Sequence, residues 1–314
     1  MILVGSKDIG PTNYLIEYTK NLNEVYWIKT KKNKELIKDF NKINNYKKKN
    51  PKLILTGSCI GSGLDKKLIE FGKKKKIKTA SFIEHWSLLR ERFLLKKKKL
   101  LKPNYLFVID DYVKNFYIKY LNFKSKNIFV VGSKYLEKLK KQKIKKKNKN
   151  FKNILFISQP HKKLQNKLYR LFHIKDYFGF SEYDVIQNII ENIDLNSLNL
   201  TIKLHPNERS NKFELLKKRK VKKIINISKT KIVEKYDLII GMDSMLLLEL
   251  HMMGAKVLSI RPNSKNLFYG NMLNIFPVVN KINNKDQLNE IYYKYKSKKV
   301  NFKKKEIKDI IRIL

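Results

Sequence analysis

The residues best suited to chemistry stand where an apolar run ends, in the segment Lys203-Leu204-His205-Pro206. Residues 200–204 form a candidate strand, and Pro206 restricts His205 to an extended or turn conformation, which ends the strand there. An imidazole and an ammonium group are then held together at the carboxyl edge of a sheet. Both groups can bind phosphate, so the motif predicts a phosphate-binding site.

A second motif follows about forty residues later, over residues 236–260. Its pattern predicts a strand, a tight turn, an apolar helix that ends near Gly254, and another strand. Asp243 or Ser244 would cap the helix, whose first N–H groups and positive dipole favour an anion. Glu249 falls in the second turn of this helix, where a carboxylate suits a ribose diol. The other interpretation is an ordinary capped helix with a glutamate that faces solvent.

The elements that must position these motifs are strands alternating with helices, in both halves of the chain. This alternation predicts an α/β fold with two doubly wound, parallel-sheet, Rossmann-like domains. We expect an N-terminal domain over residues 1–137, a lysine-rich linker over 138–152, a second domain over 153–298 and a C-terminal helix over 299–314. In such folds ligands bind at the carboxyl ends of the strands, so we expect a cleft between the two domains.

The charge pattern limits the classes of partner. The 314 residues include 71 Lys and Arg against 27 Asp and Glu, a formal net charge of +44, but only seven of the 71 are arginine. Nucleic-acid recognition usually relies on the planar arginine fork, whereas here lysine, asparagine and isoleucine, all with A/T-rich codons, are enriched together. We therefore assign most of the lysine to genome composition and expect no nucleic-acid partner. The single Cys59 excludes a disulfide framework.

The two motifs together resemble the donor-nucleotide half of GT-B glycosyltransferases. The His-Pro segment followed by a strand, Ser244, a helix and Glu249 is similar to bacterial sialyltransferases, polysialyltransferases and Kdo transferases, and to the glycerophosphotransferases of teichoic-acid synthesis. The resemblance covers residues 151–265 well and the N-terminal half only in topology. Two features depart from it. The Asp/Glu-Asp/Glu-Gly motif of the sialyltransferases is missing, and a single serine follows Asp243 where several relatives carry two hydroxyl residues.

The resemblance implies roles for individual residues in binding a CMP-, CDP- or UDP-linked sugar. His205 and Ser244 would contact the donor phosphate, and Glu249 would hold the ribose. The turn after the first strand of the second half would close on the nucleotide, and two cations would make secondary phosphate contacts. The full donor-binding set is Ser158, Gln159, Lys203, His205, Pro206, Ser244, Glu249 and Arg261.

The N-terminal half would then bind the acceptor. An inverting transferase needs one carboxylate or imidazole to remove the proton of the acceptor hydroxyl. Glu84 and His85 fit this role at a strand end, with Trp86 as a platform for a sugar, and Asp8, Asp110 and Asp111 are rivals. The other interpretation of Glu84-His85-Trp86 is a helix cap beside a packed tryptophan. We expect no metal and no cofactor. The histidines show no His-x₃-His spacing, and no Asp-x-Asp lies in a loop.

The segment from Leu88 to Lys102 alternates Leu and Phe clusters with Arg and Lys. This composition is typical of an interfacial helix on an anionic membrane surface, and equally of a lysine-rich surface helix. The start of the chain is too short for a signal peptide core, and no apolar run is long enough for a membrane span. We expect a cytoplasmic protein, which this segment could bring to the inner face of the membrane.

The leading hypothesis is a metal-independent glycosyltransferase that uses a nucleotide-sugar and acts on a glycan or lipid-linked acceptor in the synthesis of lipopolysaccharide, capsule or another surface polysaccharide. One alternative is a nucleotide-sugar 2-epimerase or hydrolase similar to the non-NAD UDP-GlcNAc 2-epimerases. The Asp-Ser-Gly-Gly run of those enzymes is here Asp243-Ser244-Met245-Leu246. The other alternative is a non-enzymatic binder of polyanions or nucleic acid.

Overall fold

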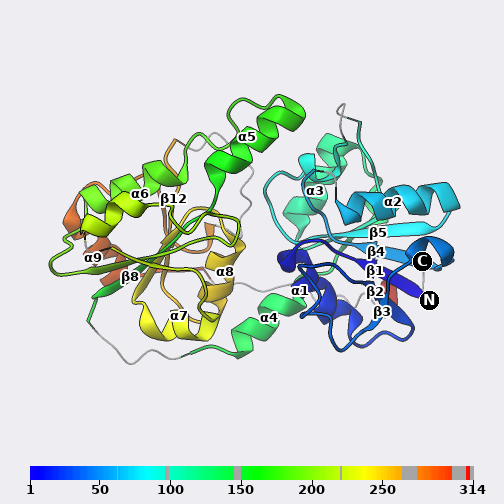
Figure 1. The fold of residues 1–314 in the computed structure, drawn as a ribbon, viewed down its shortest axis with the longest axis horizontal. Coiled ribbons are helices and arrows are strands. Elements are labelled where there is room, and N and C mark those ends of the chain that lie inside the picture. Colours follow the sequence, from blue (N-terminus) through cyan, green and yellow to red (C-terminus); the bar gives the residue numbers. More distant parts are fainter. Residues whose placement is uncertain are drawn as a thin grey trace. The chain divides into compact units, whose positions relative to one another are not determined.

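The computed structural model describes residues 1–61, 63–95, 99–144, 150–219, 221–263, 274–298 and 309–311. The chain divides into two compact units. Unit 1 comprises residues 1–137 with the end of the chain, 301–314, and unit 2 comprises residues 138–300. Each unit is a parallel sheet with helices on both of its sides (Figure 1).

Unit 1 contains a seven-stranded sheet in the order β3-β2-β1-β4-β5-β6-β7, and every pair of neighbours is parallel. Its elements are β1 (Ile2–Gly5), α1 (Ile9–Thr19), β2 (Val25–Ile28), β3 (Asn41–Ile43), β4 (Leu53–Thr56), α2 (Leu64–Lys75), β5 (Lys78–Ile83), β6 (Tyr105–Val108), α3 (Asp111–Leu121), β7 (Ile128–Val130) and α4 (Lys134–Lys141), which continues into unit 2. Short 3₁₀ turns lie at Tyr46–Lys48, Glu91–Phe93 and Ser125–Asn127.

Unit 2 contains a six-stranded parallel sheet in the order β10-β9-β8-β11-β12-β13. Its elements are β8 (Asn153–Ile157), α5 (His161–Phe172), α6 (Glu182–Glu191), β9 (Asn199–Lys203), β10 (Lys222–Ile224), α7 (Lys229–Lys235), β11 (Leu238–Gly241), α8 (Met245–Met252), β12 (Val257–Ile260), β13 (Val278–Val279) and α9 (Lys285–Tyr293). A 3₁₀ segment spans Glu214–Arg219.

The apolar runs form strands because helices cover both faces of each sheet, so side chains on both faces are buried. All four residues of β4, of β11 and of β12 are buried. Polar caps set several helix starts. Ser181 and Asp184 form a capping box on α6, and the side chains of Ser228 and Asn284 accept N–H bonds that begin α7 and α9.

In both sheets the strand order reverses beside the first strand of the unit, and this reversal creates a crevice at the carboxyl edge. The crevice of unit 1 lies between the ends of β1 and β4, and that of unit 2 between the ends of β8 and β11. Gly57 shows how closely the two loops approach in unit 1. A Cβ atom at this position would come within 2.7 Å of Pro11 Cβ and 2.8 Å of Ser6 Oγ.

The two doubly wound parallel-sheet domains expected from the sequence are confirmed. The sequence missed β3, β13, α4, α5 and α7, and it placed residues 138–141 in a linker, whereas they are the last residues of α4. Farther along the same segment, the N–H of Ile144 donates to Met253 O of unit 2. The predicted C-terminal helix over 299–314 lies outside the described residues except for 309–311, which are helical.

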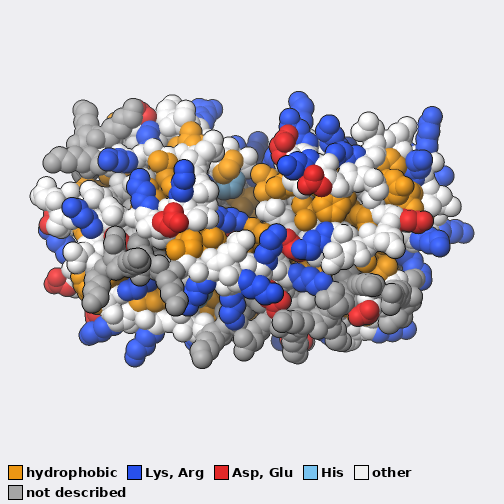
Figure 2. Space-filling view, turned by 90° about the horizontal axis from the view of Figure 1, so that it is seen from below, with side chains coloured by type: hydrophobic (Ala, Val, Ile, Leu, Met, Phe, Trp, Pro, Cys, Tyr) orange, Lys and Arg blue, Asp and Glu red, His pale blue; other side chains and the backbone are white. Residues whose placement is uncertain are grey.

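The lysines and arginines are scattered over the face seen in Figure 2, between acidic and apolar side chains, and do not gather in one stripe. The segment from Leu88 to Lys102 does not form the predicted surface helix. Its described part contains one 3₁₀ turn and a bridge between Leu94 and Leu100. Leu88, Leu94 and Phe93 are buried in unit 1, so their apolar side chains pack in the protein. No described helix is both long and apolar enough to cross a bilayer.

Candidate functional site

The crevice of unit 2 is bridged by a cluster of the buried His161 and Asp243 and the half-buried Gln159. The Asp243 carboxylate accepts hydrogen bonds from Gln159 Nε2 at 2.9 Å and interacts with His161 Nε2 at 2.8 Å. The backbone N–H of Asp243 donates to Gln159 Oε1 at 3.1 Å, so the amide of Gln159 is bound at both ends. The His161 ring stacks on Phe178, and its Nδ1 has no hydrogen-bond partner among the described residues. This cluster fixes the loop after β8 against the loop after β11.

A second network joins the loop after β8 to the His-Pro loop after β9. Ser158 Oγ donates to Glu208 Oε1 at 2.9 Å, and the N–H of His205 donates to Glu208 Oε2 at 2.7 Å. Glu208 also pairs with the buried Lys212. Pro206 lies in the turn between these residues. One carboxylate therefore holds the loop that carries the predicted phosphate ligand.

The ring of His205 is oriented by the backbone of its own loop. The N–H of Asn207 donates to His205 Nδ1 at 3.1 Å, so Nδ1 is the acceptor and the proton of the neutral ring lies on Nε2. The side chain is partly exposed. His205 can therefore donate one hydrogen bond from Nε2 to an anion at the carboxyl edge of the sheet.

Ser244 is the N-cap of α8, and its hydroxyl accepts a hydrogen bond from the N–H of Leu246. It lies three residues after the end of β11, and Gln159 lies two residues after the end of β8, so both lie beside the same crevice. Glu249, one turn farther along α8, does not face solvent. It is buried and pairs with Lys229 of α7 at 2.6 Å. Burial raises the pKa of this carboxyl, and the Lys229 ammonium opposes the shift.

The two predicted secondary phosphate contacts have other roles in the structure. Lys203 Nζ lies 3.4 Å from Ile225 O, beyond the end of β10, and burial lowers the pKa of its ammonium group. Arg261 is buried beside β12, where it donates to Ser259 Oγ and to Asn274 Oδ1. Arg261 thus joins the end of β12 to Asn274, and its guanidinium donates to protein acceptors.

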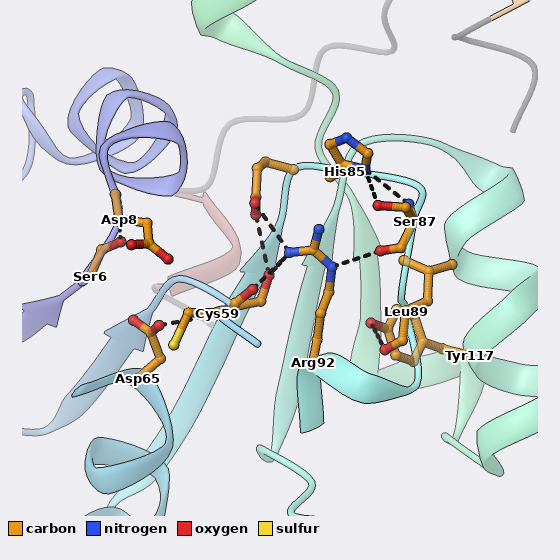
Figure 3. Close-up of polar contacts among 11 residues, drawn as sticks. Ser6, Asp8, Cys59, Asp65, His85, Ser87, Leu89, Arg92 and Tyr117 are labelled. Atoms are coloured by element: carbon orange, nitrogen blue, oxygen red, sulfur yellow. Dashed lines mark hydrogen bonds and ion pairs between the residues drawn. The ribbon is translucent and has the colours of Figure 1, made fainter. Parts of the chain in front are cut away.

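In unit 1 the ends of β4 and β5 are joined by the buried side chain of Arg92 (Figure 3). Its Nη1 donates to Ser58 O at 2.7 Å, to Ser58 Oγ at 3.0 Å and to Glu84 Oε1 at 3.2 Å. Its Nε donates to Ser87 O, while Ser58 Oγ donates to Glu84 Oε2. Burial raises the pKa of Glu84 and the Arg92 charge opposes the shift. Glu84 is therefore buried and bound by both Arg92 and Ser58.

His85 is the partly exposed residue of this strand end. Its Nδ1 accepts the N–H of Ser87 at 2.9 Å and lies 2.9 Å from Ser87 Oγ, so the neutral ring carries its proton on Nε2. Such a ring donates a hydrogen bond outward and does not offer Nε2 as a base. Asp8, after β1, presents an exposed carboxylate that pairs with Lys32 at 3.1 Å. Of the three predicted catalytic residues, Asp8 is the one with an accessible carboxylate.

The prediction that Trp86 stacks on a sugar is wrong. Its ring is fully buried, and its Nε1 donates to Asp110 Oδ2 at 2.6 Å. Cys59 is buried, and burial raises the pKa of its thiol. The neighbouring Asp65 accepts the N–H of Cys59, and burial raises its pKa to about 6.

No role for His161, Glu208 or Arg92 was predicted from the sequence. A signal existed for the first two, since His161 follows a strand-ending proline and Glu208 stands three residues after His205, the spacing at which a carboxylate can return to a backbone N–H. No local pattern links Arg92 to Ser58, which is 34 residues away. Among the described residues, no three or more His, Cys, Asp and Glu side chains are grouped as metal ligands.

No protein-family model and no curated protein sequence matches the chain. Solved structures do. The chain is similar to the UDP-GlcNAc 2-epimerase of Methanocaldococcus jannaschii, with a TM-score of 0.59 and 16% identity over 99% of this chain and 98% of that one. It is similar to HepE of Anabaena, solved in complex with UDP, with a TM-score of 0.59 and 10% identity over 93% and 89%. A glycosyltransferase from Rickettsia africae gives 0.50 and 16% over 93% and 87%. These likenesses establish a GT-B-like fold over the whole chain.

Proposed function

We propose that this protein is a glycosyltransferase that binds a nucleotide-sugar at the crevice of unit 2 and transfers the sugar without a metal or another cofactor. The observation that carries the proposal is the His205 ring, fixed by Asn207 and Glu208 with its Nε2 proton at the carboxyl edge, in the same sheet that presents the capped N-terminus of α8. An imidazole N–H and the first N–H groups of a helix suit the phosphates of a departing nucleotide.

The nucleotide in this proposal is a uridine diphosphate, because the similar HepE structure holds UDP. CMP- and CDP-linked donors are the other members of the class that the sequence resemblance implies. Glu249 would contact the ribose only if its pair with Lys229 opens toward the ligand. The Gln159–His161–Asp243 cluster supports the site by holding the two loops of the crevice in register.

For the chemical step we propose Asp8 as the general base that takes the proton of the acceptor hydroxyl. Its carboxylate is accessible at the crevice of unit 1, whereas Glu84 is bound by Arg92 and Ser58. His85 would donate its Nε2 proton in a hydrogen bond to the acceptor. Glu84 is then a positioning residue that holds the loops after β4 and β5. A glycan or lipid-linked acceptor of a surface polysaccharide is the acceptor class that the sequence resemblance implies.

The proposal is tested first by thermal unfolding of the purified protein with CMP, CDP, UDP, GDP and AMP. A ligand at a hundredfold excess over its Kd stabilises the native state by about 2.7 kcal/mol. We expect stabilisation by UDP or another pyrimidine nucleotide. Replacing His205→Ala removes one hydrogen bond to a charged group, worth about 1.5–3 kcal/mol, so Kd should rise about ten- to a hundredfold.

The matched control is His173→Asn. His173 is exposed at the end of α5 in a left-handed conformation, with φ 56°, that asparagine adopts readily. This variant should bind the nucleotide as the wild type does. A thermal shift that is absent for every nucleotide, or equal in His205→Ala and the wild type, would overturn the assignment of the donor site.

A nucleotide-sugar 2-epimerase is the second candidate, favoured by the likeness to the M. jannaschii structure over nearly the full length of both chains. The two activities differ in what they require. An epimerase inverts C2 of UDP-GlcNAc with no acceptor present, whereas a transferase releases UDP and needs an acceptor. Proton NMR of UDP-GlcNAc incubated with the protein alone separates them, since formation of the 2-epimer would refute the transferase.

A further inference from the structure

Unit 2 contains a pocket of about 530 Å³ that shares Asn207, Glu208 and Lys212 with the network around His205 and is lined by none of the other donor-site residues. Its walls are one face of α5, the first turn of α6 and the loop after His205. Five cations and two carboxylates line it. The pocket therefore lies beside the donor site and shares the His205 loop with it.

The two carboxylates of the pocket are already bound by the protein. Glu182 pairs with Lys212 at 2.5 Å through Oε1 and accepts the N–H of Lys162 at 2.9 Å through Oε2. Glu208 pairs with Lys212 and accepts from Ser158 and from the backbone of His205. These contacts also neutralise Lys212. The pocket therefore presents positive charge to a ligand, because its two carboxylates are paired with groups of its own wall.

Four cations remain without a carboxylate partner in the part of the chain that the structure describes. They are Lys162, Lys163, Arg170 and Arg209. Lys163 and Arg170 are seven residues apart on α5 and lie on the same helix face, about 10.5 Å apart along the axis. Both are exposed. Their spacing suits anionic groups that recur along a chain better than the directly linked phosphates of one nucleotide.

The remaining lining groups are amides and an aromatic ring, which are types of group that bind sugars. The amides of Asn166, Asn207 and Asn211 can pair with hydroxyl groups. The ring of Tyr183 is 45% exposed, with Lys162 Nζ and Lys212 Nζ at 5.7 Å and 4.9 Å from its centroid, and its exposed part can contact a sugar. Amides and an aromatic face between separated cations form a surface for a hydroxylated chain that carries acidic groups.

We propose that this pocket is a binding subsite for an acidic oligosaccharide, a glycan with carboxylate or phosphate groups repeated along its chain. Its role as an acceptor or product subsite rests on the proposed transferase function, whereas the binding itself does not. The pocket would hold sugar units of the growing chain beside the loop that carries His205. Acceptor recognition would then be shared by unit 2, in addition to the crevice of unit 1.

The test measures Kd by isothermal titration calorimetry with two acidic probes, tetragalacturonate and a heparin hexasaccharide, and with neutral maltotetraose and UMP as comparisons. The variant is Lys163→Ala with Arg170→Ala. The control is Lys47→Ala with Lys48→Ala, which removes the same charge from an exposed turn of unit 1. Loss of two charge-assisted contacts should raise the Kd of an acidic probe at least about tenfold in the pocket variant and leave it unchanged in the control.

The remaining outcomes are also decisive. Equal weakening in both double variants would show binding to overall charge, and saturation by neither acidic probe would refute the subsite. UMP that competes with the acidic probe for this pocket would assign it to a nucleotide and overturn the proposal. Because Lys163 Nζ donates to Asn207 O at 3.3 Å, beside His205, the binding of UDP is measured in Arg170→Ala alone, where it should be unchanged. If the acidic probe binds the pocket while UDP binds nowhere, the subsite stands and the transferase proposal fails.

Discussion

Replacing Arg92→Met tests whether Glu84 is a positioning residue. The two side chains are only 7% and 8% exposed, and Arg92 supplies hydrogen bonds to Ser58, Glu84 and Ser87. Methionine has a similar reach but offers no donor. The substitution therefore leaves a buried carboxylate that keeps the hydrogen bond from Ser58 but loses its cation, and two carbonyl groups, of Ser58 and Ser87, that lose a donor.

Breaking a buried ion pair by removing one partner costs about 3–5 kcal/mol, because an uncompensated charge stays in the protein. With a urea dependence of about 1–3 kcal/mol per molar, the unfolding midpoint of unit 1 should fall by about 1–5 M. Removing both charges in Glu84→Gln with Arg92→Met should restore a large part of the lost stability.

The loss of stability in Arg92→Met should also grow with pH. Glu84 has its folded pKa raised above the unfolded value, so the stability that its protonated form gives is lost as pH rises through the folded pKa.

Tryptophan fluorescence reports this transition selectively, since both tryptophans of the chain, Trp27 and Trp86, are buried in unit 1. The control is Arg90→Met, an exposed arginine two residues away, whose effect should stay within about 0.5 kcal/mol. A loss below about 1 kcal/mol for Arg92→Met, or no recovery in the double variant, would refute the account of Glu84 as part of a buried network.

Three further variants test other parts of the structure. The Asp65 pKa is raised from 3.8 to about 6, so its contribution to stability is full below pH 4, and about 3 kcal/mol is lost as pH rises past 6. In Asp65→Asn this pH-dependent loss of stability should disappear when urea unfolding is followed by tryptophan fluorescence. A pH profile equal to that of the wild type would contradict it. Asp243→Ala leaves His161 and Gln159 without their shared partner and should lower the free energy of unfolding of unit 2 by about 2–4 kcal/mol. Unfolding followed by far-UV circular dichroism measures this loss, which should be smaller for Asp243→Asn. Gly254→Ala should lower the unfolding temperature, because φ is +102° and the new Cβ would lie 2.9 Å from Ile144 O; a neutral result would mean that the 143–144 segment moves without cost.

The sequence predicted the sheets well because strands buried on both faces appear as apolar runs between turn residues. It missed the helix α5 because its buried side, with Leu168 and Phe172, is narrow and is interrupted by lysine and asparagine. It missed β3 because this edge strand, Asn-Lys-Ile, has one apolar residue. The helix α7 was missed for a similar reason, since it buries only Ile232 and Val233.

The candidate sites were predictable where chemistry depends on position along a strand and not where it depends on a distant partner. His205 and Ser244 lie at the carboxyl edge of one sheet because each follows a strand of that sheet. Trp86 was predicted to be a platform for a sugar because no local pattern reveals its hydrogen bond to Asp110, which is 24 residues away. Glu84 was predicted to be a base because its partner Arg92 lies in the segment from Leu88 to Lys102, for which the sequence predicted a surface helix.

The position of Glu208 has a consequence for the kinetics of the proposed reaction. One of its oxygens holds the backbone of His205, and the other receives Ser158 and Lys212, whose side chain lines the pocket for acidic sugars. A ligand that draws Lys212 away from Glu208 changes the restraint on His205. Thermodynamic reciprocity then requires the donor nucleotide to change the affinity for the glycan by the same factor. The nucleotide and the glycan would bind synergistically or antagonistically rather than independently, and release of the nucleotide would alter how long the protein retains the glycan.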